Sequence, residues 1–425
     1  MRDIALLCLL LGLGWLSLSR PWLGVLGLAV VGTLHPQGYA EGFMRHAPVF
    51  AVLFAVVVFS ALFHTWRAGT WLRPPWQRLL TWQTIGLVLL WAWFALTSHY
   101  ALLPWEAWDK YWLVGKILPP LLLTLWLIDS REKLLYLVVT LALCILLPAI
   151  KGGYWAVAAG FQDRVYGPPG SPYYDNNAFA VAVAMAIPLL ALWWHQTRDR
   201  GIRLAILAGM ALCYGAVVSS WSRGGMLALA AVTLFLLWYG KRRFLVLPGL
   251  ALLAALLFAQ LPEAWFGRMQ TLMAYQADAS AQDRLAVWRI GFDFARQHPW
   301  TGGGFNAWPV LTLERGGSLD WHSAYVEVLA EHGFVGLGLW GGLLLGTLVG
   351  LGRLARRSRH AHASWVRPYA GMLQASLAAY ATGAITLGIA YWELPYHLIV
   401  LAALTGEMAA RHGRSKLADP VRHTA

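Results

Sequence analysis

The chain has 425 residues, of which 59% are hydrophobic and 12% are charged, whereas soluble domains carry about 25% charged residues. Trp occurs 25 times, and the formal net charge is +13. This composition excludes an ordinary soluble enzyme and predicts an integral membrane protein. The basic residues gather in connections between apolar runs, so we assign the positive charge to membrane topology and not to nucleic-acid binding.

Apolar runs follow one another along almost the whole chain. Lipid offers no partners for backbone hydrogen bonds, so each run is expected to form a helix of roughly 20 residues. The fold prediction is therefore an all-α, polytopic membrane bundle of about 12 transmembrane helices. The runs are 4–18, 21–34, 48–66, 79–97, 111–128, 133–150, 178–195, 203–220, 225–240, 244–260, 324–351, 368–389 and 394–410.

The first two runs leave the count open, because Arg20 and Pro21 separate two short apolar stretches. A hairpin predicts about 13 crossings with the N-terminus outside, and one broken span predicts about 12 with the N-terminus inside. Counting spans puts every strongly basic connection on one side, which the positive-inside rule identifies as the cytoplasm. These connections are 67–78, 197–203, 241–243, 353–367 and 411–416.

One outward segment is much longer than an ordinary connection. Residues 261–323, about sixty in number, are expected to fold as a partly helical cap over the bundle. We therefore divide the chain into four parts. They are an N-terminal transmembrane bundle (1–260), the cap (261–323), C-terminal transmembrane helices (324–410) and a cytoplasmic tail (411–425).

Within the cap, "SAQDRLAVWRIGFDFARQHPW" has the period of an amphipathic helix that ends before Pro299. The stretch "TGGGFNAW" that follows is expected to be a flexible turn. A surface helix on the outer bilayer face is the plainer interpretation of the same periodicity. The predicted apolar face consists of Leu285, Trp288, Phe292 and Ala295.

Cations on the outward side are not explained by the positive-inside rule, and together they predict an anion site. Lys116 falls in the outer half of the run 111–128, and Lys151 is expected to open the loop "KGGYWAVAAG". Arg223 begins a helix after "SSWS", where free N–H groups favour anions and two glycines allow close approach. Arginine suits phosphate oxygens in two-point contacts. The remaining outward cations are Arg164, Arg284 and Arg289.

His322 opens "HSAYVEVLAEHGFVG" at the mouth of an apolar helix. With an ordinary pKa of about 6.5, a histidine can accept or donate a proton near neutral pH. We predict neither a metal nor a cofactor, because the outward segments lack a dense grouping of carboxylates and histidines. Weaker candidates for polar residues of the same site are Tyr325, Glu327, Glu393, His397 and Asp175, the last of which also fits an ordinary helix N-cap.

Three of the segments described above, taken in their order along the chain, resemble those of a known protein superfamily. "SSWSRGGMLALAA", "DRLAVWRIGFDFARQHPWTGGGFNAW" and "HSAYVEVLAEHGFVGLGLW", in this order around a long outward loop, resemble the O-antigen ligase and polymerase superfamily of bacterial surface-glycan assembly. "MRDIALL" with "SRPWLGV", and "YGPPGSPYYDNNAFAVAVAMAIPLL", resemble more narrowly the O-antigen ligase-like or O-glycosylation ligase branch.

The resemblance implies a fold similar to GT-C membrane glycosyltransferases, in the bacterial inner membrane with the active site facing the periplasm. It implies a donor glycan on undecaprenyl diphosphate and a lipid A core acceptor, joined by an O-antigen ligase without a metal. His322 and Arg284 would be catalytic, with His322 acting on the acceptor hydroxyl. The diphosphate would be bound by Arg223, Arg284, Arg289, Lys116 and Lys151.

Other functions remain open at this point. A Wzy-like polymerase and a protein O-oligosaccharyltransferase use the same donor with another acceptor, so the diphosphate site does not separate them from a ligase. A polytopic transporter should show repeated halves and polar groups near mid-membrane, and we find no internal repeat. A membrane scaffold would not account for outward cations beside a histidine.

Overall fold

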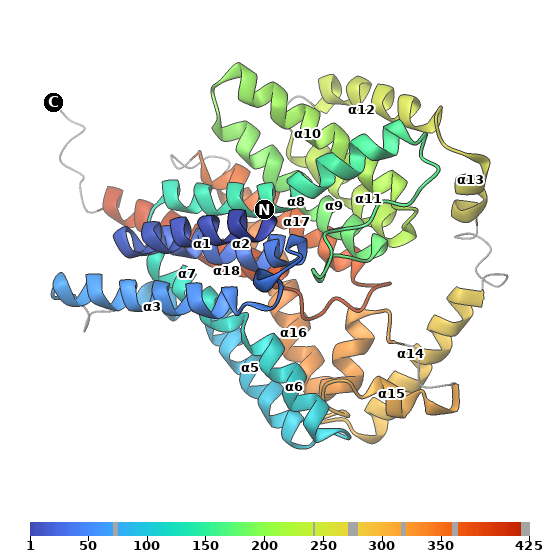
Figure 1. Ribbon diagram of the computed structural model, residues 1–425, viewed down its shortest axis with the longest axis horizontal. Coiled ribbons are helices and arrows are strands. Elements are labelled where there is room, and N and C mark those ends of the chain that lie inside the picture. Colours follow the sequence, from blue (N-terminus) through green and yellow to red (C-terminus); the bar gives the residue numbers. More distant parts are fainter. Residues whose placement is uncertain (71–74, 241–242, 271–278, 316–319, 359–363, 418–425) are drawn as a thin grey trace.

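The computed structural model describes residues 1–70, 75–240, 243–270, 279–315, 320–358 and 364–417 (Figure 1). Within these ranges the chain folds into helices and contains no strand, which confirms the all-α prediction. The α-helices are α1 (Arg2–Ser19), α2 (Pro21–Leu34), α3 (Val49–Arg67), α4 (Trp76–Leu79), α5 (Trp82–His99), α6 (Pro104–Gly115), α7 (Leu118–Leu127), α8 (Arg131–Ala158), α9 (Asn176–Gln196), α10 (Arg200–Ser219), α11 (Arg223–Tyr239), α12 (Arg243–Phe258), α13 (Glu263–Gln270), α14 (Ala279–Gln297), α15 (Trp308–Leu311), α16 (Ala324–Arg357), α17 (Val366–Gly383) and α18 (Glu393–Leu417). Short 3-10 helices are η1 (Pro36–Tyr39), η2 (Phe43–His46) and η4 (Leu313–Arg315).

Helix α9 lies at the centre of the bundle. Every residue from Ala178 to Leu192 is buried, as expected for a helix that is apolar on all sides. It packs against α8, α10, α11 and α17, which surround it in Figure 1. Because the N-terminus of α9 and the start of α11 lie at the same end of this core, residues far apart in sequence meet there.

Six described helices are long and apolar enough to cross a membrane: α1, α3, α8, α9, α10 and α16. Helices α2 and α11 are apolar but shorter, and Leu247–Phe258 meets Glu263–Gln270 at a bend of 111°. The chain is thus a multi-pass membrane helix bundle, and the count of about 12 crossings stays a prediction. Of the predicted cytoplasmic segments, 71–74, 241–242, 359–363 and 418–425 lie outside the described residues.

Helices α1 and α2 form an antiparallel hairpin about Arg20. Gly27 faces Leu13 and Gly24 faces Ser17, which are positions at similar distances on either side of Arg20. The side chain of Asp3, at the start of α1, accepts a 2.9 Å hydrogen bond from the backbone N–H of Met44, beyond the end of α2. The structure therefore favours the hairpin over a single broken span.

Two predicted helix boundaries were wrong. The run 111–128 is broken into α6 and α7, because Pro119 stands in the first turn of α7, where its missing N–H is tolerated. Conversely, α8 continues past residue 150 to Ala158, so Lys151 lies inside a helix and not at the opening of a loop. The glycines after Lys151 serve close packing: a Cβ on Gly152 would collide with Val165, and one on Gly153 with Leu212.

The described part of the cap contains α13, α14 and α15, and α14 packs against α16 (Figure 1). Helix α14 was predicted, and Ala295 of its predicted apolar face is buried, but Leu285 and Phe292 of that face are 36% and 47% exposed. From residue 282 onward, the other buried residues of the helix are Val287 and Gly291. Gly291 explains this register, since the absence of a side chain allows α14 to approach Trp321 and Ala330 closely.

Candidate functional site

His322 lies in the short segment 320–323 that leads into α16, and its neighbours are held in place. Trp321 is fully buried, and its carbonyl accepts a 2.9 Å hydrogen bond from Trp288 Nε1 of α14. On the other side, Ala324 N donates to the Ala384 carbonyl at 2.9 Å. His322 itself is half-buried and has φ 47°, a left-handed conformation that is uncommon outside glycine. Such backbone strain gathers at functional sites.

Charged groups from three segments act on the His322 ring. Burial lowers the pKa of His322 below its ordinary value of 6.5, and the Arg284 guanidinium of α14 lowers it further. The carboxylates of Asp320 and Asp175 raise the pKa of the same ring. One imidazole thus lies within electrostatic reach of an arginine and two acids, which suits a proton acceptor beside an anion.

Arg223 begins α11, as predicted, at the same end of the bundle. The Ser222 hydroxyl caps the helix by accepting from Gly225 N at 3.0 Å. Asn176, at the start of α9, donates from Nδ2 to the Ser220 carbonyl at 2.7 Å and so holds the preceding turn. Like His322, Trp221 in this turn has positive φ, at 58°. The dipole of α11 favours an anion at this helix start.

The glycines after Arg223 have a packing role. A Cβ on Gly225 would collide with Ala180 of α9, and one on Gly224 would lie 2.5 Å from Thr386 Oγ1. Thr386 belongs to the connection 384–392 between α17 and α18, whose Ala384 carbonyl holds Ala324. The helix start that carries Arg223 and the segment that carries His322 therefore meet through this connection.

Glu331 is buried below His322 and joins three segments. Its carboxylate accepts hydrogen bonds from Asn306 N at 3.0 Å, Trp321 Nε1 at 3.3 Å and Tyr391 Oη at 2.7 Å. These donors come from the cap, from the segment before α16 and from the connection 384–392. Glu331 therefore holds Trp321, the residue next to His322, in a fixed position relative to the cap and to the connection 384–392.

The polar chain continues into the bundle through His332. This fully buried ring lies between Thr97 Oγ1, 2.7 Å from Nδ1, and Tyr391 Oη, 2.9 Å from Nε2. Burial raises the pKa of Tyr391 well above its ordinary value, and the charges of Glu331 and Glu327 add to the increase. Tyr391 therefore stays protonated and can donate to Glu331.

Helix α16 is broken at Gly333, whose φ of 68° and ψ of −174° are not helical. The carbonyls exposed by the break are taken by the glycine run of the cap: Gly303 N donates to Ala330 at 2.9 Å and Gly304 N donates to Glu331 at 2.8 Å. The expectation of a flexible turn was wrong, because this run is buried and paired. Adjacent glycines serve a backbone-to-backbone contact here.

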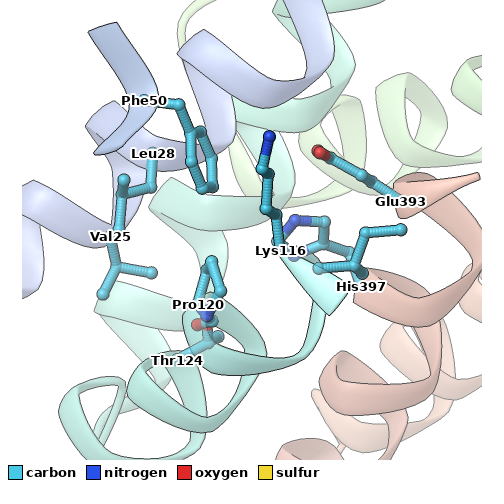
Figure 2. Close-up of a pocket in the computed structure, with 9 residues that line it drawn as sticks. Val25, Leu28, Phe50, Lys116, Pro120, Thr124, Glu393 and His397 are labelled. Carbon is cyan, nitrogen blue, oxygen red and sulfur yellow. The ribbon is translucent and has the colours of Figure 1, made fainter. Parts of the chain in front are cut away.

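Lys116 lies away from His322, in a cavity that Glu393 and His397 of α18 also line (Figure 2). A Cβ on Gly32 of α2 would collide with the Glu393 carboxylate, so Glu393 is pressed against that helix. The cavity measures about 10 Å³, room for a single water. A role of Glu393 and His397 in binding a sugar acceptor gains no support from a space of this size.

Lys151 lies in a third place, a pocket of about 160 Å³ that it shares with Arg164. The predicted group of outward cations is therefore divided. Arg284 and His322 lie within electrostatic reach of each other, Lys151 accompanies Arg164, and Lys116 accompanies Glu393.

Arg289 is exposed on α14, five residues beyond Arg284. At 3.6 residues per turn the two side chains point about 140° apart around the helix axis. Arg284 is one turn before the buried Val287 and shares the face toward α16. Arg289 does not share that face, so it would reach a ligand at His322 only from the far side of α14.

The weaker candidates have structural contacts. Asp175 caps α9 by accepting from Asn177 N at 2.9 Å and Ala178 N at 3.1 Å, as its N-cap interpretation predicted. Tyr325 donates from its hydroxyl to the Ala381 carbonyl at 3.0 Å. Glu327 Oε2 accepts from Ala390 N at 3.1 Å. These bonds attach the start of α16 to α17 and to the connection that follows it.

Sequence reasoning missed three residues of the site: Asp320, His332 and Tyr391. The signal for two of them was visible, since Asp320 is two residues before His322 and His332 follows Glu331 directly. Tyr391 is distant in sequence, and only the fold brings it to Glu331. Among the described residues no group of three or more His, Cys, Asp or Glu side chains is arranged to hold a metal ion.

Two family models match the chain. One, described as O-antigen ligase (Wzy_C), matches residues 208–341, and a family of unknown function (DUF5935) matches residues 1–198. The segment 208–341, matched by the O-antigen ligase model, contains Arg223, Arg284, Arg289 and His322. No curated protein matches the chain. The resemblance predicted from the sequence is confirmed over residues 208–341.

Proposed function

Over residues 208–341 the chain belongs to the O-antigen ligase family, and we propose that it transfers a glycan en bloc from undecaprenyl diphosphate to a hydroxyl of the lipid A core. The proposal places the protein in the bacterial inner membrane, with its site facing the periplasm. The observation that supports it best is the convergence of Arg284, Asp175 and Asp320 on His322, beside the helix start at Arg223.

In the proposed reaction the acceptor oxygen forms a bond to the anomeric carbon of the donor. The bond from that carbon to the diphosphate oxygen breaks, and undecaprenyl diphosphate leaves with the electron pair. The acceptor proton passes to His322. Negative charge grows on the departing diphosphate, and in this proposal Arg284, Arg223 and the N-terminus of α11 stabilise it.

The environment of His322 suits the role of proton acceptor. Its lowered pKa keeps the ring neutral near pH 7, so that a nitrogen lone pair is free to accept the proton. Once the ring is protonated, the carboxylates of Asp320 and Asp175 stabilise the imidazolium. The proposal assigns the diphosphate to Arg284 and Arg223, because Arg289 is on the far side of α14 and Lys116 and Lys151 line other cavities.

The test measures transfer in lipid discs that contain an undecaprenyl-diphosphate glycan, a lipid A core acceptor and EDTA. Wild-type protein is expected to glycosylate the core. His322→Ala and Arg284→Ala are each expected to lower the rate by about 100-fold or more, the usual effect of removing a proton acceptor or a charge-stabilising group. Transfer that survives EDTA agrees with a reaction that needs no divalent cation.

Exposed residues of the same types serve as controls. His99→Ala at the end of α5 and Arg296→Ala on α14 should keep the wild-type rate, because both side chains are exposed. A His322→Ala variant as active as wild type would refute the site. If the donor glycan lengthens instead, the protein is a polymerase, and if only a protein acceptor is modified, it is a protein O-oligosaccharyltransferase.

A further inference from the structure

A pocket that holds Lys151 and Arg164 adjoins the turn before Arg223. It opens between the outer part of α8, the segment 163–169 and η1, and its volume is about 160 Å³. Lys151 and Trp155 lie one helical turn apart on α8, so both face it. Arg164 and Tyr166 come from the segment, and Tyr39 comes from η1.

The wall of this pocket is preformed by close backbone packing. Gly152 lets the segment approach α8, and Gly38 lets η1 touch the carbonyl of Pro169, positions where any Cβ would collide. Val165 N donates to the Ser219 carbonyl at 3.1 Å, and Gly167 N donates to Tyr174 at 3.0 Å. A pocket held in this way loses little entropy when a ligand enters.

Its chemistry is that of a site for an anionic sugar. Among the described residues that line it, two are cations and none is acidic. Three aromatic rings accompany the cations: Tyr39 is 39% exposed, Trp155 is 53% exposed and Tyr166 is 51% exposed. Exposed rings offer apolar faces with a polar edge, which fit a sugar ring, while the guanidinium and the amine fit phosphate or carboxylate oxygens.

The pocket also adjoins the proposed donor site. The Arg164 guanidinium lies 6.0 Å from the ring centroid of Trp221, which is two residues before Arg223. The hydrogen bond from Val165 to Ser219 joins the pocket wall to the end of α10, directly ahead of the same turn. A sugar held by Lys151 and Arg164 is therefore next to the turn that presents Arg223.

We propose that this pocket binds a phosphorylated sugar of the acceptor, with Lys151 and Arg164 holding the phosphate and Trp155 and Tyr166 contacting the sugar ring. The assignment to the acceptor rests on the transfer reaction proposed above. It gives Lys151 a role distinct from donor diphosphate binding. The same cations could instead hold the phosphate of an anionic lipid headgroup, and the experiment separates the two sources.

The first experiment measures binding without turnover. Saturation-transfer NMR is recorded on glucose 6-phosphate and on glucose, with the full chain in phosphatidylcholine discs. Glucose 6-phosphate is expected to bind wild type at least about tenfold more tightly than glucose, because charge-assisted hydrogen bonds contribute to it alone. The Lys151→Gln, Arg164→Gln double variant should lose this preference, and Arg45→Gln, an exposed arginine of η2, should keep it.

Equal binding of the two sugars by wild type would overturn the proposal. So would displacement of glucose 6-phosphate when phosphatidylglycerol replaces part of the phosphatidylcholine, since the pocket would then be a headgroup site.

The second experiment compares a phosphorylated core acceptor with the same acceptor after phosphatase treatment. Phosphate removal should raise the wild-type KM about tenfold, and the double variant should show the higher KM for both acceptors with kcat unchanged. If the protein binds glucose 6-phosphate but transfers no glycan, the sugar phosphate pocket stands and the proposed transfer reaction fails. If the protein transfers glycan with a KM that changes neither on phosphate removal nor in the double variant, the reaction stands and the pocket proposal fails.

Discussion

At the scale of single residues, the groups around His322 have opposite effects on the pKa of its ring. Burial and Arg284 favour the neutral ring, and Asp320 and Asp175 favour the charged one. Two of these groups can be changed without removing a packed side chain. Asp320→Asn keeps the size of the residue, and Asp175→Asn keeps a good helix N-cap on α9. The charge around His322 can thus be altered in steps.

We expect the acid limb of kcat/KM for transfer to lie below pH 6.5, since the lowered pKa of His322 delays protonation of the ring as pH falls. Asp320→Asn removes a carboxylate that raises this pKa, so its acid limb should move to still lower pH. Asp175→Asn should move the limb in the same direction. pH–rate profiles of the three proteins measure this, and a limb displaced upward would contradict the assignment of His322 as base.

The hydrogen bonds of the buried Glu331 carboxylate contribute to the stability of the fold. Its three donors require an acceptor at both carboxylate oxygens, and the amide of Gln would present an N–H₂ to at least one of them. Glu331→Gln is therefore expected to lower the free energy of unfolding by about 1–3 kcal/mol. Thermal unfolding in discs measures the loss, with Glu314→Gln on exposed η4 as the unaffected control.

At the scale of elements, the break in α16 ties a membrane helix to the cap. Gly333 has φ 68°, and a Cβ there would collide with the Trp300 carbonyl and lie 2.6 Å from the Pro299 carbonyl. The Pro299 carbonyl also accepts a 2.9 Å hydrogen bond from Phe334 N. The approach of two backbones explains why glycine stands at this position.

Gly333→Ala should destabilise the fold by about 1–3 kcal/mol from backbone strain alone, with the collision adding to the loss. Gly338→Ala, in the same helix with open space around its Cα, should be neutral or stabilising by up to about 1 kcal/mol. Thermal unfolding of both variants tests the break. Equal melting temperatures would mean that α16 is not broken at residue 333.

Much of the helix pattern was predictable, and the reasons for the failures are physical. Hydropathy located the runs, and local capping chemistry placed Asp175 and Arg223 at helix starts. The buried face of α14 depends on Gly291 meeting Trp321, a contact that periodicity does not encode. The same holds for Tyr391, which reaches Glu331 only through the fold. The lysines and arginines on the predicted outward side were also expected to form one group. The packing of the helices instead distributes them among separate places on that side.

At the scale of the whole molecule, the buried helix α9 indicates which ends of the bundle lie on the two sides of the membrane. Its 21 residues span roughly 30 Å, about the thickness of the hydrocarbon core. The exposed Tyr174 precedes its start, near Asp175 and the proposed site, and the exposed Arg198 follows its end. These two positions should therefore lie on opposite sides of the membrane.

In a variant with Cys8→Ser, which removes the exposed cysteine, Tyr174→Cys should react with an impermeant maleimide from the periplasmic side of intact spheroplasts. Arg198→Cys should react only after the membrane is opened, since the positive-inside rule places the connection 197–203 in the cytoplasm. Labelling of both cysteines before opening would contradict the topology and, with it, a periplasmic site.

The pairing of Gly303 and Gly304 with α16 also shortens the part of that helix that is free to cross the lipid. The turns from Ala324 to His332 hydrogen-bond to the cap and to the connection 384–392, so they are anchored in the structure that surrounds His322. The part that follows the break, from Phe334 to Arg357, is roughly 36 Å long, which is enough by itself for a hydrocarbon core of about 30 Å. In the proposed topology, Glu327 and Glu331 therefore lie on the water side of the crossing, buried in the structure around His322.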